Sequence, residues 1–263
     1  MLKKFGNYRL VEVSKRSYAK KSRLDVDSNI GGDGLEYLAL DEREVETEPW
    51  KITGKNGCAA AVKALRVCFK DIPGILMDAH FTGRLMQMVS GIYSFERKEG
   101  GRTRSIFFSR ERAYINAKLE FSKRRGIIDH MLHEFDYEHS ELRNEVRVSA
   151  KEVHLKFKDV SSGATHLRIL SHLCIISDYF YVTKKSRFEP ISSLNTMSVC
   201  GYSEYMPVER TLDVEVVVRF PEGVFPSEDD TVIHCLGLVF YQKAAGRYYE
   251  LAGGSGVEVY DVF

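Results

Sequence analysis

Apolar residues recur at helical spacing between residues 58 and 96. The segment CAAAVKALRVCFK is apolar around most of its circumference and charged on a narrow stripe, which predicts a largely covered helix. After the break at Pro73 and Gly74, large apolar residues repeat at spacings of three and four, which is typical of a helix that packs on another helix. These residues are Phe81, Leu85, Met88, Ile92 and Phe95. We therefore expect a small helical unit over residues 51–104.

Beyond residue 146 the apolar period changes to two, which is typical of half-exposed antiparallel strands. VHLKFKDV and LDVEVVVRF both alternate in this way. CLGLVFYQ is apolar on both faces, which predicts a central strand, and a turn at Ala245 and Gly246 should lead into a return strand. Short strands separated by turns predict an antiparallel β-sandwich over residues 146–263.

The remaining regions are less regular. Residues 1–50 are polar, with a strand-like YRLVEV and glycines in NIGGDG, which predicts an extended arm or hairpin. Such an arm has too few apolar residues to be stable alone, so it must lie on the rest of the chain or on a neighbouring subunit. Residues 105–145 fit either a mixed strand and helix passage or two irregular strands. The predicted fold class is α+β, with an N-terminal extended arm and a small helical unit followed by the antiparallel β-sandwich.

Net charge, cysteine content and the lengths of apolar runs limit the compartments and partners to be expected. The 38 Lys and Arg residues nearly balance the 37 Asp and Glu residues, so no global field attracts the chain to nucleic acid or to an anionic membrane. Five scattered cysteines form no C-x-x-C pair, and we interpret them as reduced apolar fillers. No apolar run is long enough for a signal peptide or a membrane helix, which predicts a cytoplasmic protein without a membrane span.

Two strand segments carry a resemblance to a protein family. SSGATHLRIL and LGLVFYQKAAGRYYELAGGSGVEVYDV resemble recurrent segments of an uncharacterised family of Bacteroidota proteins, which has an SGATH strand, an FYQ strand and a G-x-x-Y-x-L return strand. GCAAAVKALRVCFKDI and FTGRLMQMV are similar to the helices that precede this domain in the family. The resemblance covers residues 50–263 and implies a helical part followed by a β domain. The family has no assigned activity, cofactor or catalytic residue, so none is implied here. The polar residues 1–50 depart from the family's short strand-forming start.

The densest group of potential metal ligands is DHMLHEFDYEH, which contains His130, His133 and His139. In a helix His130 and His133 would share a face with Glu134 beside them, an arrangement that zinc and di-iron ligands use. The histidines do not have the H-E-x-x-H spacing, however, and a solvated polar run is the better explanation. A metal-dependent enzyme that uses these histidines is kept as an alternative function.

His166 is the one histidine in the SGATH segment. It shares a strand face with Ala164 and Arg168, whereas Leu167 and Ile169 face the other side, which predicts a surface or cross-strand position. The glycine clusters TGKNG, GGDG and GGSG lack the spacing of phosphate-binding loops, and no G-x-S-x-G occurs. We therefore assign no catalytic residue, cofactor or metal site.

Charged runs in the arm favour contacts with protein. KRSYAKKSR is basic and could follow a phosphate backbone, but the acidic LDEREVETE comes soon after it. Complementary charges suit subunit contacts, so nucleic acid is the less favoured partner. The predicted function is a non-enzymatic structural or assembly protein that self-associates as a homo-oligomer, or binds another protein, through its arm and helical face. The expected interface residues are Phe81, Leu85, Met88, Ile92, Phe95, Tyr8, Leu10 and Tyr18.

A carbohydrate-binding β-sandwich is the alternative from another class. Tyrosines on a strand surface can form a sugar platform, because the ring buries area while the hydroxyl still finds a partner. The platform residues would be Tyr179, Tyr181, Tyr202 and Tyr205. Tryptophan is the more usual platform residue, and the single tryptophan, Trp50, lies outside the predicted β domain.

Overall fold

The computed structural model shows an α+β chain that divides into two compact units, Met1–Gly57 and Cys58–Phe263. In the first unit β1 (Lys3–Phe5) pairs antiparallel with β2 (Tyr8–Leu10), which contains the first residues of the strand-like YRLVEV. The glycine turn and Tyr18 lie outside the described residues. The structure describes residues 3–5, 8–10, 49–73, 80–100, 105–119, 121, 135–153, 160–251 and 256–263.

Both predicted helices are present. α2 (Pro49–Cys68) begins earlier than the apolar pattern indicates. Proline suits the first helical position because it lacks an N–H group that would have no partner there, and its fixed φ is already helical. α3 (Phe81–Gly100) follows the predicted break. A shorter helix, α4 (Arg112–Lys118), comes after β3 (Ser105–Ile106), so the described part of residues 105–145 is the mixed strand and helix passage.

Two long antiparallel strands form the centre of the second unit. β6 (His166–Ser177) pairs with β12 (Asp230–Ala244) along its whole length. The other edge of β6 pairs with β9 (Ser198–Tyr202) and β10 (Met206–Pro207). The other edge of β12 pairs with the predicted return strands, β13 (Arg247–Glu250) and β14 (Gly256–Val262). These six strands make one antiparallel sheet.

Two three-stranded sheets accompany the large one. The first has the order β11-β5-β4, and the second has the order β3-β7-β8. The segment LDVEVVVRF forms β11 as predicted, whereas residues 154–159 of VHLKFKDV lie outside the described residues. The bounds are β4 (Asp136–His139), β5 (Glu145–Val153), β7 (Tyr179–Val182), β8 (Arg187–Pro190) and β11 (Leu212–Arg219).

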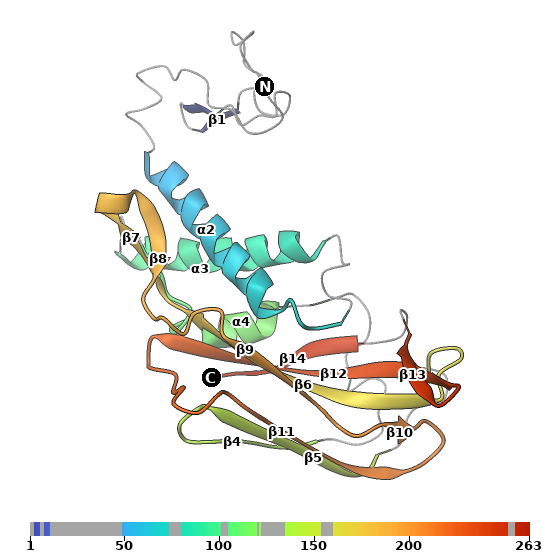
Figure 1. Cartoon of the computed structure of the whole chain (residues 1–263). Helices are drawn as coiled ribbons and strands as arrows, with labels where there is room; N and C mark the ends of the chain where they lie inside the picture. Colours follow the sequence, from blue (N-terminus) through green and yellow to red (C-terminus); the bar gives the residue numbers. More distant parts are fainter. Residues whose placement is uncertain are drawn as a thin grey trace. The chain divides into compact units, whose positions relative to one another are not determined.

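The central strands are buried on both faces because their alternate side chains enter two different cores. In β6, Leu170 and Cys174 lie in the core that the helices share, whereas Ile169 and Leu173 face the second core with β5 and β11. β12 alternates in the same way, which confirms the prediction that CLGLVFYQ is a central strand. The sheet is therefore covered by α2, α3 and α4 on one face and by β11-β5-β4 on the other (Figure 1).

The helical face expected to bind another subunit is buried within the chain. Phe81, Leu85, Met88 and Ile92 are at most 2% exposed and lie in the core between the helices and the large sheet. Phe95 is half-buried, with its ring edge-on to Tyr114 at 4.9 Å. The expectation that this face is an interface is therefore wrong for the four buried residues. Apolar residues at helical spacing indicate that one face of the helix is buried. They do not indicate whether the same chain or another subunit buries it.

One glycine allows β14 to approach β12 closely. A Cβ atom at Gly237 would lie 2.8 Å from Val257 Cγ2 and 3.1 Å from the Gly256 carbonyl oxygen. We expect Gly237→Ala to lower the free energy of unfolding by about 1–3 kcal/mol, measured by urea unfolding, because the strand would have to move. Gly83→Ala in α3 is the control, since nothing lies within 4 Å of its Cβ position. Equal stability of the two variants would contradict the steric argument.

Candidate functional site

Tyrosines and basic residues gather where β6 begins and β12 ends, beside β10 and β13 (Figure 1). They lie on the sheet face that also carries the helices, since Tyr202, Tyr205 and Tyr248 pack against the core shared with those helices. Most of these side chains are partly exposed, so the group forms a surface rather than a core. This Tyr–Arg surface consists of His166, Arg168, Tyr202, Tyr205, Tyr241, Lys243 and Tyr248.

Rings and cations form a continuous stack in this surface. The rings of Tyr205 and Tyr248 are parallel within 6°, with centroids 3.7 Å apart. Arg168 Cζ lies 4.7 Å from the ring centroids of both Tyr202 and Tyr205, and Lys243 Nζ lies 5.0 Å from that of Tyr248. Because each of the two stacked rings covers one face of the other, the cations must occupy the opposite faces. Cation–π attraction therefore holds both ends of the stacked pair.

Strand register brings the remaining rings to the stack. Tyr241 is the β12 partner of His166, and Lys243 is the partner of Tyr248 across the hairpin turn. Tyr241 meets Tyr205 edge-on at 5.0 Å, and His166 meets Tyr248 edge-on at 4.9 Å. Cross-strand pairs of this kind stabilise a sheet surface. The SGATH, FYQ and GRYYEL segments that carry the family resemblance thus meet at one place.

Backbone hydrogen bonds fix the loop that carries two of the tyrosines. Arg168 Nε donates to the Ser203 carbonyl oxygen at 2.6 Å. Ser203 N–H donates to the Ile169 carbonyl oxygen, and Ile169 N–H donates to Ser203 Oγ, both at 2.9 Å. On the neighbouring strand, Lys243 N–H donates to Thr165 Oγ1 at 2.8 Å. The Tyr–Arg surface is therefore held in place by hydrogen bonds within the chain.

Two ionisable groups of the Tyr–Arg surface have shifted pKa values. Desolvation and, to a smaller extent, the charge of Lys243 lower the pKa of His166, so its imidazole is neutral at pH 7. Desolvation raises the pKa of Tyr202 to about 12, with smaller contributions from Cys200, Tyr241 and Glu250. Neutral phenols and a neutral imidazole offer ring area and hydrogen-bonding groups.

The predicted sugar platform is divided by the fold. Tyr202 and Tyr205 belong to the Tyr–Arg surface, but Tyr179 is 3% exposed in the helix-side core, and Tyr181 packs edge-on against Phe188 at 5.5 Å. The expectation that all four tyrosines form one platform is therefore wrong. Tyr179 and Tyr181 lie on β7, which belongs to a different sheet from Tyr202.

Sequence reasoning missed Arg168, Tyr241, Lys243 and Tyr248 as members of a site. A usable signal was present, because a two-residue turn at Ala245 and Gly246 fixes the register of the hairpin. That register places Lys243 opposite Tyr248. His166 does occupy the expected cross-strand position, with Leu167 and Ile169 buried behind it.

A second polar group lies between the two sheets and is closed to solvent. Ser171 Oγ and His234 Nε2 are 2.9 Å apart, a spacing that a nucleophile and its base would have. Both residues are 0% exposed, and His234 Nδ1 has no hydrogen-bond partner in the described part of the chain. The Tyr137 ring stacks on His234 at 5.3 Å, and its hydroxyl donates to Asp261 Oδ2. Without access for a substrate, this group acts as a polar part of the core.

A third group surrounds His172 beneath the helices. His172 Nε2 lies 2.9 Å from the Cys68 carbonyl oxygen, and Nδ1 lies 3.0 Å from Cys200 Sγ. Since a carbonyl only accepts, Nε2–H donates to it and Nδ1 accepts from the Cys200 thiol. All five cysteines are free, as predicted, and desolvation raises the pKa of Cys200 to about 12. Desolvation also raises the pKa of Cys58, Cys174 and Cys235, which fill the core as small apolar side chains.

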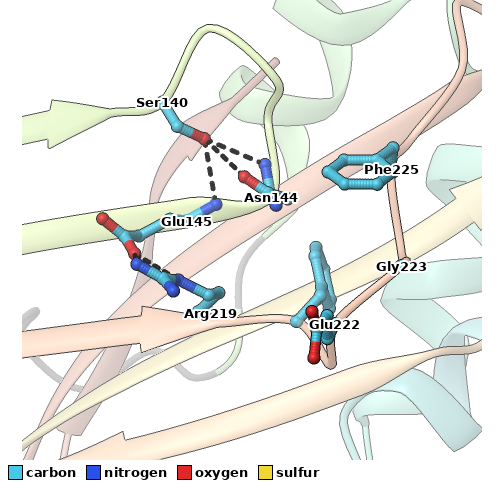
Figure 2. A pocket seen from close by; sticks show the side chains of 8 residues that line it. Ser140, Asn144, Glu145, Arg219, Glu222, Gly223 and Phe225 are labelled. Carbon is cyan, nitrogen blue, oxygen red and sulfur yellow. Dashed lines mark hydrogen bonds and ion pairs between the residues drawn. The ribbon is translucent and has the colours of Figure 1, made fainter.

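A pocket of about 690 Å³ opens at the end of the β11-β5-β4 sheet (Figure 2). Ser140 Oγ accepts the N–H groups of Asn144 and Glu145, each at 3.1 Å, and the Glu145 carboxylate pairs with Arg219. Phe225, which is 52% exposed, lines the opposite wall. Glu145 and Arg219 neutralise each other in this pocket, which leaves Glu222 as its further charged side chain.

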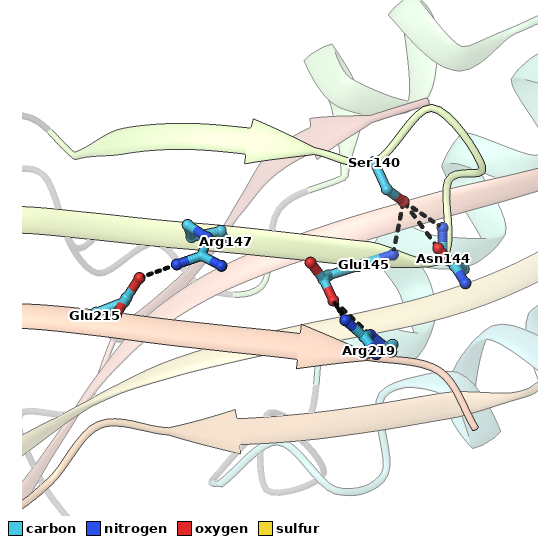
Figure 3. A network of polar contacts seen from close by, with 6 residues as sticks. All are labelled: Ser140, Asn144, Glu145, Arg147, Glu215 and Arg219. Carbon is cyan, nitrogen blue, oxygen red and sulfur yellow. Dashed lines mark hydrogen bonds and ion pairs between the residues drawn. The ribbon is translucent and has the colours of Figure 1, made fainter. Parts of the chain in front are cut away.

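Charge pairs continue from the pocket along the outer face of the sheet (Figure 3). Arg147 on β5 pairs with Glu215 on β11, and Glu145 pairs with Arg219, its partner in the strand register. All four side chains reach solvent, and exposed pairs of this kind contribute little to stability. This face is a solvated surface.

The proposed metal ligands are only partly described. His139 lies exposed on β4, where its ring stacks on Phe263 at 4.4 Å, and His130 and His133 lie outside the described residues. Within the ranges that the structure describes, no group of three His, Cys, Asp or Glu residues could hold a metal ion. None of the described helices combines the length and the apolar character needed to cross a membrane.

Comparisons with protein families, curated proteins and solved structures find no match for this chain.

Proposed function

We propose that this protein is a non-enzymatic assembly protein that self-associates through the Tyr–Arg surface. The observation that carries the proposal is the stack of Arg168 with Tyr202, Tyr205 and Tyr248. Tyrosine and arginine are the residue types that concentrate binding energy at the centres of protein interfaces. A stack that is already ordered loses little conformational entropy when a partner covers it. In this proposal the Tyr–Arg surface replaces the apolar helical face of residues 81–95 as the surface of self-association.

The arm supports self-association because its charges are separated along the chain. Residues 3–23 contain eight Lys and Arg residues and one Glu. Residues 25–48 contain nine Asp and Glu residues and one Arg. A chain that carries both signs in separate segments is complementary to a second copy of itself. The short β1-β2 hairpin, being two-stranded, also needs a covering surface to be stable.

The proposal includes a β-sandwich as the scaffold. Its two layers are the six-stranded sheet and the β11-β5-β4 sheet, whose inner side chains share one apolar core. Free thiols at all five cysteines suit a reducing compartment, which supports a cytoplasmic location.

Carbohydrate binding is less well supported than assembly. A sugar ring stacks on an open aromatic face. Tyr205 has Tyr248 on one face and Arg168 on the other, so it offers a sugar only its edge. The metal-dependent alternative rests on His130, His133 and His139, of which only His139 belongs to the described residues.

Self-association is tested with two neighbouring tyrosines of β13. Tyr248 belongs to the Tyr–Arg surface, whereas Tyr249, which is 51% exposed, lies on the opposite face of the same strand. We expect sedimentation velocity to show concentration-dependent assembly of the full chain. Tyr248→Ala should weaken assembly about 30-fold, the effect of losing one interface hot spot, and Tyr249→Ala should leave it unchanged.

Two outcomes would overturn the proposal. One is a wild-type chain that stays monomeric at every concentration. The other is an equal effect of the two substitutions, because the Tyr–Arg surface would then have no special part in assembly. Circular dichroism of both variants must match the wild type, so that any loss is not caused by unfolding.

A further inference from the structure

We infer that the Tyr–Arg surface binds the segment LEYLALDEREVETE, residues 35–48, of a second copy. This inference rests on the proposed self-association and names the partner of the surface. Two features of the segment match two features of the surface, namely its carboxylates and its large apolar side chains.

The first match is one of charge. The surface carries the cations of Arg168 and Lys243. Two carboxylates lie near it, Glu250, which pairs in register with Tyr241, and the exposed Glu204, which precedes Tyr205 in the chain. Residues 41–48 contain five carboxylates and one arginine. Both cations lie against aromatic rings, where part of their hydration is already lost, so an added carboxylate is attracted more strongly than in open water. Opposite charges also fix the register of a bound segment.

The second match is apolar. Immediately before the carboxylates, the segment carries Leu35, Tyr37, Leu38 and Leu40. The partly exposed edges of Tyr202, Tyr205 and Tyr248 offer these side chains a surface to cover. The apolar side chains of the segment would contact the tyrosine rings, and its carboxylates would contact the cations of the Tyr–Arg surface. We expect the apolar contact to provide most of the affinity and the charges to orient the segment.

The basic segment of residues 3–23 competes for the same carboxylates. It is more strongly charged than the Tyr–Arg surface, so charge alone does not decide between the two. The experiment must therefore show that Lys243 and Tyr248 themselves receive the acidic segment. A complementation test with two full-length variants does so.

The first variant, called the acceptor variant, keeps the Tyr–Arg surface and replaces the five carboxylates of residues 41–48 by amides, whereas Glu36 is kept. Its substitutions are Asp41→Asn, Glu42→Gln, Glu44→Gln, Glu46→Gln and Glu48→Gln. The second, called the donor variant, keeps the acidic segment and carries Lys243→Ala and Tyr248→Ala. Each variant alone should assemble at least about tenfold more weakly than the wild type. An equimolar mixture should recover a 1:1 dimer, because each variant supplies what the other lacks.

A further variant tests whether assembly depends on the carboxylates of residues 35–48 or only on the net charge of the arm. Asp25→Asn, Asp27→Asn and Asp33→Asn remove carboxylates from the same acidic half of the arm but outside residues 35–48. This variant should assemble as the wild type does. A fluorescent peptide of residues 35–48 should bind the acceptor variant, and the same peptide with the five amides should bind about tenfold more weakly.

The outcomes distinguish this inference from the proposed function. A wild-type chain that never assembles overturns the proposed function and the inference together. Wild-type assembly that the acceptor variant retains in full overturns the inference alone, because the acidic segment is then not the donor. A mixture that stays monomeric, or a peptide that fails to bind, shows that residues 35–48 pair elsewhere and also overturns it.

Discussion

Acidification from pH 7 to pH 5 should lower the free energy of unfolding of the second unit by about 4 kcal/mol. Two buried histidines cause this loss. Desolvation lowers the pKa of His172 to about 4, although the Cys68 carbonyl and Asp71 act in the opposite direction. Desolvation also lowers the pKa of His234 to about 3, with a smaller contribution from His172. Both side chains are 0% exposed, so the folded protein cannot hydrate their charged forms.

The sign of this change in stability follows from the pH at which the histidines take up a proton in the folded and in the unfolded state. In the unfolded chain a histidine takes up its proton as the pH falls through about 6.5. In the folded protein these two stay neutral until the pH reaches their lowered pKa values. Their contribution to stability is therefore complete above about pH 6.5 and is lost as the pH falls below it. At pH 5 each histidine accounts for about 2 kcal/mol of the loss, since one pKa unit corresponds to about 1.4 kcal/mol.

Urea unfolding at pH 7, 6 and 5 measures this loss. His234→Gln removes one titrating group, so it should lower stability at pH 7 but reduce the pH dependence by about half. His139→Gln is the matched control, because it makes the same substitution at a histidine that is exposed on β4. Desolvation raises the pKa of Asp178, which offsets a part of the loss at the acid end. A stability that is flat between pH 7 and pH 5 would contradict the buried neutral state of the two histidines.

Local sequence patterns predicted the strands in which the alternation of apolar and polar residues matches the burial in the fold. LDVEVVVRF alternates in sequence, and in β11 Val214, Val216 and Val218 are buried while Val217 is exposed. CLGLVFYQ has no polar face, and the central strand that it forms has apolar layers on both sides. In these segments, burial alone decides which residue types are tolerated.

The alternation of residue types in a short strand did not predict which of its two faces is buried. In YFYV, alternation correctly separates Phe180 from Tyr179 and Tyr181, yet Tyr179 is 3% exposed and Phe180 is 44% exposed. Tyrosine and phenylalanine differ little in burial preference, so the packing of β7 against its neighbours decides the outcome. The predicted platform failed for this reason.

The Tyr–Arg surface could not be predicted from single segments, because its members come from four strands and a loop. His166 and Arg168 lie on β6, Tyr202 on β9, and Tyr248 on β13. Only the pairing of β6 with β12 and β9, and of β12 with β13, brings them together. The prediction that the apolar face of α3 contacts another subunit was wrong for a related reason. The spacing of its apolar residues is helical as predicted, but this face packs against a sheet of the same chain.

Replacing Phe69 by alanine should lower the free energy of unfolding by about 3–5 kcal/mol, the range for removing a large aromatic side chain from a core. Phe69 directly follows α2 and is 0% exposed. Its ring meets Phe121 edge-on at 5.0 Å and Phe81 edge-on at 6.0 Å, and it lies 6.1 Å from the ring of His172. The side chain thus joins α2, α3 and β6, and its loss leaves a cavity where these elements meet.

Phe225→Ala is the matched control, because it removes the same atoms from a side chain that is 52% exposed. Its cost should stay below about 1 kcal/mol. Urea unfolding at pH 7 compares both variants with the wild type. If Phe69→Ala costs no more than Phe225→Ala, the contact of the helices with the large sheet does not depend on the Phe69 ring. A large cost for Phe69→Ala alone would show that the helical face predicted to bind another subunit is held by the chain's own sheet, which leaves assembly to surfaces such as the one around Arg168.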